Sequence, residues 1–379
     1  MNLSFLIYTY FPYGGQQRDF LRILNECLSR GNQVTVYTRQ WQGDIPEGVD
    51  LVIVPVQSTN RIKLYREFTE WVGDALSKAE DSLIVGFNKM PLLDVYFAAD
   101  PCFAEKAETQ RGIYYRFTPR FKHFKSYEES LFGKDSKAEI MLLSPQQRRD
   151  FAKHYPYCES RFHDVPPGID RDRRVDQRDT KARAELRKDF GIQDDQFLIL
   201  QIGSGFRVKG VDRSLKALAS LDREMRDKCR FILIGQDKPS RFQRLANRLG
   251  LKDLVTILPG RDDIPRFLAA ADLLLHPAYM ESAGYVLLEA TIAGLPVLTT
   301  ATCGYAFHIE KAGSGEVCSE PFQQQDLDSR LKDMLLQLPD ADWSASGLEY
   351  GKNDELYSLP QFAAQLIEEA ARKKQAASS

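Results

Sequence analysis

Short apolar runs alternate with amphipathic segments along most of this chain, and this alternation restricts the fold more than any other feature. Two segments with apolar residues at helical spacing, 16–31 and 63–78, each lie between apolar runs. Strands that alternate with helices predict a mostly parallel sheet. Up to residue 100, four apolar runs rich in β-branched and aromatic residues predict strands at 3–8, 33–38, 51–56 and 82–87.

The alternation restarts after residue 195, whereas residues 101–160 are aromatic, charged and irregular. The sequence DVPPGIDRDRR from Asp164 marks a boundary. We predict two doubly wound α/β halves, 1–167 and 168–356, that face a central ligand-binding cleft. An amphipathic helix at about 357–375 is expected to pack back on the first half. In the second half, strands are expected at 196–204, 230–235, 255–260, 272–277 and 295–300.

Composition excludes several classes of protein. With 51 Lys and Arg against 53 Asp and Glu, the net charge of -2 argues against a nucleic-acid partner. No two of the six cysteines are closer than 15 residues, which excludes a CxxC metal or redox pair and fits a reducing cytoplasm. No run reaches the ~18 apolar residues that span a bilayer. The first eleven residues lack the features of a signal peptide, so a cytoplasmic protein is expected.

Two glycine-bearing turns follow predicted strands. Gly14 and Gly15 precede a helix, where backbone N–H groups can approach an anion, although a tight turn alone would also use them. Residues 202–210, IGSGFRVKG, match neither the dinucleotide fingerprint nor the P-loop, which excludes a typical dehydrogenase. Arg207 and Lys209 in this loop suit a diphosphate, but two solvated cations are an equal alternative.

A third turn carries two glutamates. A helix from about residue 282 would place Glu281 and Glu289 on broadly the same side, ~12 Å apart along the axis. Glu289 lies in an apolar stretch, where a carboxylate without a partner is costly. Small residues separate the glutamates, and the backbone N–H groups at this helix start could hold a diphosphate. The residues concerned are Ala283, Gly284, Tyr285 and Val286.

These motifs together resemble retaining glycosyltransferases of the GT-B fold, in family four of the sequence classification. The resemblance rests on the His-Pro strand end, the E-x7-E spacing, LEA…AGLPV, PPGID and Gly14-Gly15. From residue 3 to about 370, further segments are similar to the members that add the first outer-core hexose to heptose in lipopolysaccharide. These segments are FPYGGQQRDF, GFNKMPLLDVYFAAD, GQDKP, ADLLLHPAY, LPVLTT and DELYSLP.

The resemblance implies an enzyme with a UDP-sugar donor and a lipid A–inner core acceptor. Among the UDP-hexoses, UDP-glucose is the favoured donor. The first half would face the acceptor, and the second would bind the donor. Glu289 would bind the ribose hydroxyls, Glu281 the sugar hydroxyls and Lys209 the pyrophosphate. Asp100 would face the reacting sugar. Three further donor contacts are implied. Gly15 would let its loop close over the diphosphate, and Arg173 would reach the donor from the linker. Arg261 would lie at the uracil through its backbone.

One position departs from the family pattern. The family has arginine directly after the glycine at 203, whereas this chain has Ser204, so Arg207 is the candidate replacement. Metal is not required in this fold, no cofactor is expected, and the D-x-D of Asp170 and Asp172 is interpreted as chance. A phosphorylase-like enzyme with bound pyridoxal and a non-enzymatic scaffold are the alternatives. Glucose, galactose and their N-acetylamino forms remain open as the donor sugar.

Residues 111–125, RGIYYRFTPRFKHFK, hold five cations and five aromatic residues but no acid. An aromatic cluster packed on the sheet is one interpretation. The other, which we favour for an enzyme with a lipid-borne acceptor, is peripheral, salt-sensitive binding to the anionic inner face of the cytoplasmic membrane. The cations are Arg111, Arg116, Arg120, Lys122 and Lys125.

Overall fold

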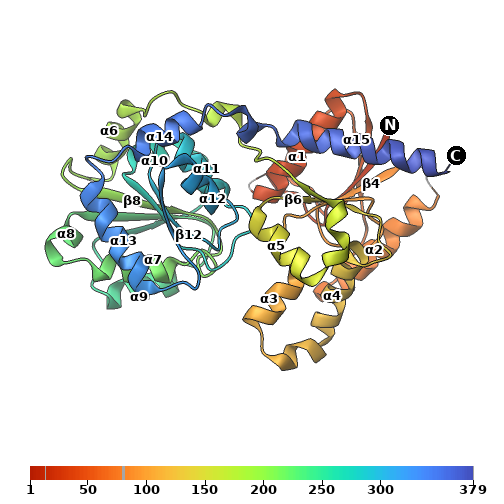
Figure 1. Cartoon of the computed structure of the whole chain (residues 1–379), viewed down its shortest axis with the longest axis horizontal. Coiled ribbons are helices and arrows are strands. Elements are labelled where there is room, and N and C mark those ends of the chain that lie inside the picture. The colour runs from red at the N-terminus through yellow and green to blue at the C-terminus, as the bar shows by residue number, and fades with distance from the viewer. Residues whose placement is uncertain (13, 79–81, 379) are drawn as a thin grey trace. The chain divides into compact units, whose positions relative to one another are not determined.

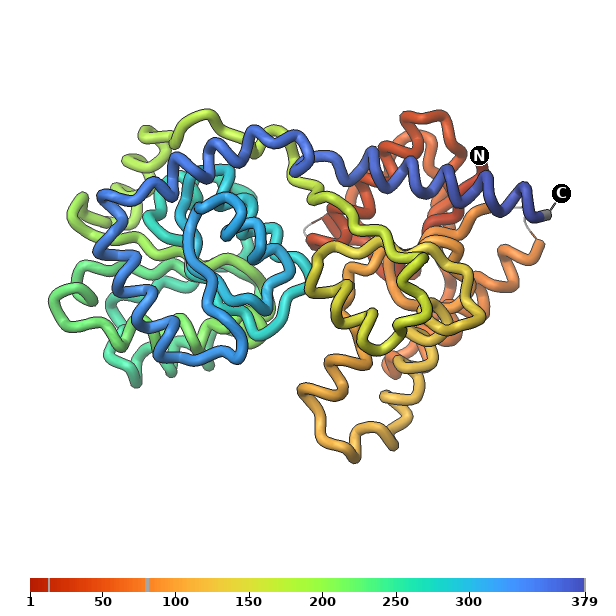
Figure 2. The backbone as a smooth tube through the Cα atoms, viewed as in Figure 1, coloured from red at the N-terminus to blue at the C-terminus, as the bar shows by residue number. Residues whose placement is uncertain are grey.

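The computed structural model describes residues 1–12, 14–78 and 82–378. The chain divides into two compact units, Met1–Gly168 with Tyr357–Ser379, and Ile169–Leu356 (Figure 1, Figure 2). Each unit is a parallel sheet with helices around it, which confirms the predicted doubly wound α/β class. Among the described residues, no helix has both the length and the apolar character needed to cross a bilayer.

The first unit is built on a seven-stranded sheet in the order β3-β2-β1-β4-β5-β6-β7, with every described pairing parallel. Its centre is aromatic: Phe20 packs edge-on against Phe5 and Phe87, and all three rings are fully buried. The strands are β1 (Asn2–Leu6), β2 (Gln33–Thr38), β3 (Val49–Ile53), β4 (Leu83–Gly86), β5 (Val95–Phe97), β6 (Glu139–Leu142) and β7 (Phe162–Asp164). The helices are α1 (Gly15–Ser29), α2 (Arg61–Leu76), α3 (Phe103–Gln110), α4 (Pro119–Phe132), α5 (Pro145–His154) and α15 (Leu359–Ser378).

The second unit has a six-stranded parallel sheet in the order β10-β9-β8-β11-β12-β13. Leu198, Ile199 and Leu200 of the central β8 are all fully buried, because helices cover both faces of a parallel sheet. The strands are β8 (Phe197–Ile202), β9 (Cys229–Ile234), β10 (Val255–Leu258), β11 (Leu273–His276), β12 (Val297–Thr300) and β13 (Gly315–Cys318). The helices are α6 (Thr180–Asp189), α7 (Val211–Ser220), α8 (Arg223–Asp227), α9 (Ser240–Arg248), α10 (Ile264–Ala270), α11 (Tyr285–Ile292), α12 (Ala306–Ala312), α13 (Gln324–Gln337) and α14 (Trp343–Tyr350).

The C-terminal helix α15 returns to the first unit and lies beside α1 (Figure 1). Asn32, which follows α1, donates to Glu368 of α15 over 3.0 Å. Lys374 contacts the carboxylate of Asp94, just before β5, at 2.9 Å. The described residues of α15 thus belong to the first unit.

Residues 101–160, expected to be irregular, are mostly helical. Figure 1 shows α3 and α4 extending away from the sheet of the first unit. Their base is fixed by the fully buried carboxylate of Glu128, which accepts hydrogen bonds from Lys89 Nζ at 2.6 Å and from the backbone N–H groups of Phe103 and Ala104 at 2.6 and 2.9 Å. The hydroxyl of Tyr155 donates to the same carboxylate at 2.9 Å.

Candidate active site

Three loops of the second unit meet at one edge of its sheet, because they follow the carboxyl ends of the neighbouring strands β8, β11 and β12. Backbone hydrogen bonds join the loops. Tyr279 N–H donates to Val208 O over 2.8 Å, and Glu281 exchanges bonds with Thr302 O (3.2 Å) and Gly304 N–H (2.9 Å). The sheet therefore brings together the glycine loop at 203–210 and the glutamate turn at 277–284. Ligands of open parallel sheets bind at this edge.

Gly210 allows the closest approach between these loops. Its φ is +70°, and a Cβ there would lie 2.0 Å from the carbonyl oxygen of Pro277. Any side chain would push the two loops apart. The neighbouring Lys209 is therefore held over the glutamate turn, with its own carbonyl accepting from Gln201 Nε2 at 2.7 Å.

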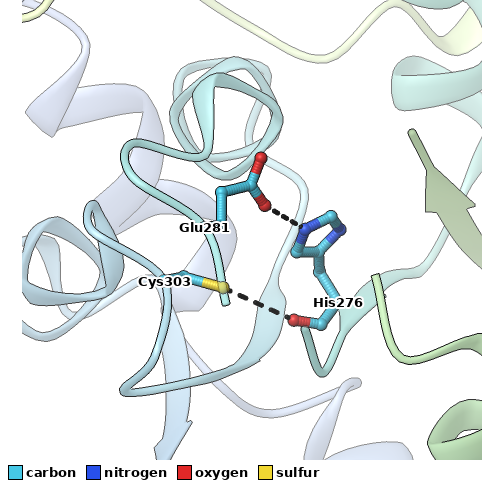
Figure 3. Close-up of side chains that lie close together, drawn as sticks. All are labelled: His276, Glu281 and Cys303. Carbon is cyan, nitrogen blue, oxygen red and sulfur yellow. Dashed lines mark hydrogen bonds and ion pairs between the residues drawn. The ribbon is translucent and has the colours of Figure 1, made fainter. Parts of the chain in front are cut away.

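Glu281 is held between two nitrogen donors. The ammonium of Lys209 contacts Oε1, and Nε2 of His276 lies 2.7 Å from Oε2 (Figure 3). The glutamate side chain is 16% exposed, and His276 is completely buried. Burial alone would raise the pKa of Glu281, but the neighbouring His276 and Lys209 lower it to about 2. The carboxylate is thus ionised at neutral pH and accepts hydrogen bonds only.

The helix that follows Glu281 begins later than expected. Gly284 has a φ of +104° and caps α11, which starts at Tyr285 rather than near residue 282. Glu281 instead forms an isolated β-bridge with Cys303, so the predicted helical spacing between Glu281 and Glu289 is wrong. The φ of +104° favours glycine at this position, whereas a Cβ there would lie at an ordinary contact distance of 3.7 Å from the carboxyl carbon of Glu281.

The predicted diphosphate cradle does lie at a helix N-terminus. Tyr285 and Val286 are the first residues of α11, directly after Gly284. The buried Ala283 is fixed by its carbonyl, which accepts from Tyr305 N–H at 2.7 Å. Helix N-termini favour anions because their first N–H groups have no intrahelical acceptor.

Glu289 and Arg173, both predicted donor contacts, line a common cavity of about 170 Å³. Glu289 enters it from α11, and Arg173 from the short turn after Asp170. Asp179 and Arg266 add charge to a wall that is otherwise mainly apolar. This combination of an apolar surface and a few charged groups is typical of small-molecule sites.

The other predicted cations of this unit lie at the ends of β8 and β10. Arg207 is exposed, and among the described residues its guanidinium has no hydrogen-bond or ion-pair partner. Ser204, at the position of the usual family arginine, accepts a hydrogen bond from Gln236 N–H at 3.0 Å. Arg261 forms a bidentate ion pair with Asp263: Nε lies 2.7 Å from Oδ1, and Nη2 lies 2.8 Å from Oδ2.

Gly15 and Asp100 belong to the other unit. Gly15 is the first residue of α1, and a Cβ there would meet no atom of the described residues within 4 Å. Asp100 is exposed in the loop after β5, and its carbonyl accepts from Gln147 Nε2 at 3.1 Å. Both residues lie where strands of this sheet reach their carboxyl ends.

Among the described residues, two groups of side chains place possible metal-ligand atoms within 4.8 Å of one another: His276, Glu281 and Cys303, and Glu105, Glu108 and His154. In the first group, the Lys209 ammonium already occupies the carboxylate and would repel a cation. Burial raises the pKa of Cys303 to about 11, which keeps the thiol protonated, and its Sγ faces the carbonyl of His276 (Figure 3). The chemistry of this group favours recognition of a ligand hydroxyl over binding of a metal.

Comparison with known proteins places the chain in a family. Residues 182–343 match the family of glycosyl transferases group 1. The lipopolysaccharide glucosyltransferase WaaG of Escherichia coli (strain K12) is 46% identical over 368 residues, which cover 97% of this chain and 98% of the relative. A crystal structure of WaaG, a glycosyltransferase involved in lipopolysaccharide biosynthesis, has a TM-score of 0.90 and covers 96% of this chain and 99% of that one.

A more distant structure shares the fold alone. Anabaena Alr3699/HepE in complex with UDP-glucose is 18% identical, with a TM-score of 0.73 over 98% of this chain and 100% of that chain. The resemblance inferred from the motifs is confirmed. This chain is a glycosyltransferase of the GT-B fold and belongs to the lipopolysaccharide glucosyltransferase family that includes WaaG.

Proposed function

We propose that this enzyme transfers glucose from UDP-glucose to a heptose of the lipopolysaccharide inner core, with retention of the α configuration. The contact of Lys209 with Glu281, beside the N-terminus of α11, is the observation that most supports a nucleotide-sugar site. The E. coli relative is named a lipopolysaccharide glucosyltransferase, and the HepE neighbour was crystallised with UDP-glucose. The unit Ile169–Leu356 would bind the donor, and the unit containing Asp100 would face the acceptor.

In this proposal the donor spans the features of the second unit. The diphosphate lies against Lys209 and the N–H groups of Gly284, Tyr285 and Val286, with Arg207 as an additional cation. The ribose hydroxyls bind Glu289 near Arg173, and the uracil lies at the backbone of Arg261. Glu281 accepts hydrogen bonds from sugar hydroxyls, which is the role that its ionised state suits.

The reaction follows from where charge develops. The bond between the glucose C1 and the β-phosphate oxygen breaks, and a bond from C1 to the heptose oxygen forms on the same face. The heptose hydroxyl proton passes to the leaving phosphate, which departs as UDP. Lys209 and the helix N–H groups stabilise the growing negative charge of this leaving group.

An assay of UDP release tests the proposal. The purified enzyme is given UDP-glucose, UDP-galactose and their N-acetylamino counterparts, with and without a heptose-terminated lipid A–inner core acceptor. We expect the acceptor to stimulate UDP release, and UDP-glucose to give the highest kcat/KM. Faster turnover of another donor would correct the sugar, and no release from any of the four would contradict the function.

The acceptor is a membrane lipid, and the first unit offers a surface that suits it. The basic aromatic segment, residues 111–125, presents Ile113, Tyr114 and Phe117 with exposures of 67%, 83% and 72%. Large exposed apolar side chains beside cations are typical of surfaces that bind anionic membranes. We propose that this segment holds the enzyme at the cytoplasmic face of the inner membrane.

Four of the five cations in that segment are available for lipid headgroups, and one is not. Lys125 donates to the hydroxyl of Tyr155 at 2.7 Å and pairs with Glu129 at 3.3 Å. Its predicted membrane role is therefore reassigned to holding α4 on the unit. The four exposed cations are Arg111, Arg116, Arg120 and Lys122.

A further inference from the structure

We propose that His276 is a positioning residue for donor-sugar recognition: its Nε2–H fixes Oε2 of Glu281, so that Oε1 is presented to a sugar hydroxyl. The inference rests on the proposed function, which gives Glu281 its role. It gives a role to a residue that entered the sequence analysis only as part of the His-Pro strand end, and that acts through the glutamate. Figure 3 shows the imidazole directed at the carboxylate.

The contact has a defined direction. Nε2 of His276 lies 2.7 Å from Oε2 of Glu281. Because the pKa of Glu281 is lowered to about 2, the carboxylate is ionised and can only accept. The hydrogen therefore sits on Nε2, and the imidazole is the donor.

The surroundings of His276 indicate that this one bond is why a histidine is present. The residue is completely buried at the end of β11, where its carbonyl accepts from Thr299 Oγ1 at 2.9 Å. Its other ring nitrogen, Nδ1, is buried without a hydrogen-bond partner among the described residues. A buried ring with an unsatisfied nitrogen is less stable than an aliphatic side chain of similar size. The bond to Glu281 is the compensating feature.

The bond matters most after the donor has bound. In this structure Lys209 holds Oε1, so both carboxylate oxygens have partners. A diphosphate that draws the ammonium of Lys209 towards itself leaves His276 as the remaining partner of the carboxylate. The backbone of Glu281 is fixed at both its N–H and its carbonyl, but its side-chain torsions are not fixed by those bonds. His276 restricts them while the sugar is bound.

A double-mutant cycle tests the proposal. His276→Leu should lower kcat with UDP-glucose by about tenfold or more, while the affinity for UDP measured by calorimetry changes by less than about threefold. His276→Gln retains an N–H donor of similar reach and should recover most of the lost kcat. In the Glu281→Gln background, His276→Leu should cause less than about a twofold further loss, because coupled residues are not additive.

A matched control uses a second buried histidine of the same unit. His308 is 6% exposed, and its Nδ1 lies 2.6 Å from the Tyr350 hydroxyl, outside the site. His308→Gln should leave kcat unchanged. Full kcat in His276→Leu, no recovery in His276→Gln, or fully additive losses in the double mutant would each overturn the positioning role.

The outcome is separable from a failure of the proposed function. A parent enzyme that binds UDP but releases none from UDP-glucose would overturn the donor assignment and this inference with it. An active parent with an unaffected His276→Leu variant would overturn the inference alone. Thermal unfolding of every variant identifies any loss of kcat that comes from a loss of folded protein.

Discussion

The ammonium of Lys209 contacts Oε1 of Glu281, although the two residues lie 72 positions apart in the sequence. Their loops follow the adjacent strands β8 and β11, and the close approach that Gly210 allows between the loops brings the side chains together. A cation proposed for the diphosphate and a carboxylate proposed for the sugar thus neutralise each other in this structure. Donor binding would replace this ion pair with contacts to the ligand.

Lys209→Ala should weaken UDP binding by about 1.5–3 kcal/mol, the range for a charge-assisted hydrogen bond. The loss has two causes: the phosphate contact disappears, and Glu281 is left as an unneutralised carboxylate beside the diphosphate. Isothermal calorimetry with UDP measures it. The matched control is Lys216→Ala on α7, an exposed lysine of the same unit that pairs with Asp212. Equal UDP affinity in Lys209→Ala and the control would refute the phosphate role.

Glu281→Gln and Glu289→Ala should separate sugar recognition from nucleotide binding. Glu281→Gln should lower kcat while UDP binds at least as well, since Lys209 loses the ion pair that competes with the phosphate. Glu289→Ala should weaken UDP by about tenfold through lost ribose contacts. Glu310→Ala, an exposed glutamate on α12, is the control for the charge change. If Glu281→Gln loses as much UDP affinity as Glu289→Ala, the two roles are assigned wrongly.

Gly15→Ala tests whether a ligand, rather than packing, requires glycine at the start of α1. A Cβ at Gly15 meets no atom within 4 Å in the part of the chain that the structure describes, so the melting temperature should not fall. Transfer from UDP-glucose should fall, because the new methyl group obstructs the approach of the loop to the diphosphate. Gly112→Ala, where Cβ space is also open, is the matched control for the melting temperature and for hydrolysis of UDP-glucose in solution, since Gly112 lies in the basic aromatic segment proposed to bind the membrane. Full transfer activity in Gly15→Ala would remove Gly15 from the site.

Chelation should leave catalysis intact. In the proposed function, Lys209 and the helix N–H groups supply the positive charge that a metal ion would otherwise provide to the leaving diphosphate. Transfer in excess EDTA should therefore match transfer with added magnesium to within about threefold. Abolition of transfer by EDTA, with recovery on addition of a divalent cation, would instead make the three-residue group around Glu281 or the D-x-D turn a metal site.

Five of the six described strands of the second unit, β8 to β12, could be predicted because each is a largely apolar run between turn residues. The edge strand β13 was not predicted, because its sequence GEVC is too short and too polar to stand out. In the first unit, β5 and β7 are only three residues long, and β6 lies among charged residues. Such short strands have no periodicity of their own, and they form because the neighbouring strand supplies hydrogen bonds. The helical content of residues 101–160 was missed for a related reason: the buried network around Glu128 joins residues that are far apart in the sequence.

The sequence motifs selected candidate residues for the site, but they did not predict how these residues are arranged in space. Glu281 and Lys209 could be selected from motifs, but the E-x7-E spacing implied a helix that Gly284 prevents from starting before Tyr285. His276 was noted only as part of the His-Pro strand end and was given no role, because the sequence does not show that its ring faces the glutamate. The sequence signal that could have identified His276 is its position, because it ends a strand five residues before the motif glutamate Glu281.

Removal of charge from the basic aromatic segment should abolish membrane binding without loss of donor chemistry. A variant with serine at Arg111, Arg116, Arg120 and Lys122 loses four exposed cations, each worth about 1 kcal/mol near an anionic surface. Lys125 is retained because it bonds to Tyr155. The parent should sediment with vesicles of phosphatidylglycerol at low salt, less so at high salt, and not with pure phosphatidylcholine, since salt screens exposed charges. The variant should stay in the supernatant and still hydrolyse UDP-glucose.

The control for this variant must lose the same charge elsewhere. Serine at four exposed cations of the other unit, Lys181, Arg223, Arg241 and Lys252, gives the same net charge. If the basic aromatic segment is the membrane surface, this control variant should sediment nearly as the parent does. Because both variants are equally acidic, a difference between them cannot come from overall repulsion by the vesicle. Equal loss of binding in the two variants, or a parent that binds neutral and anionic vesicles alike, would reject the segment as the membrane-binding surface.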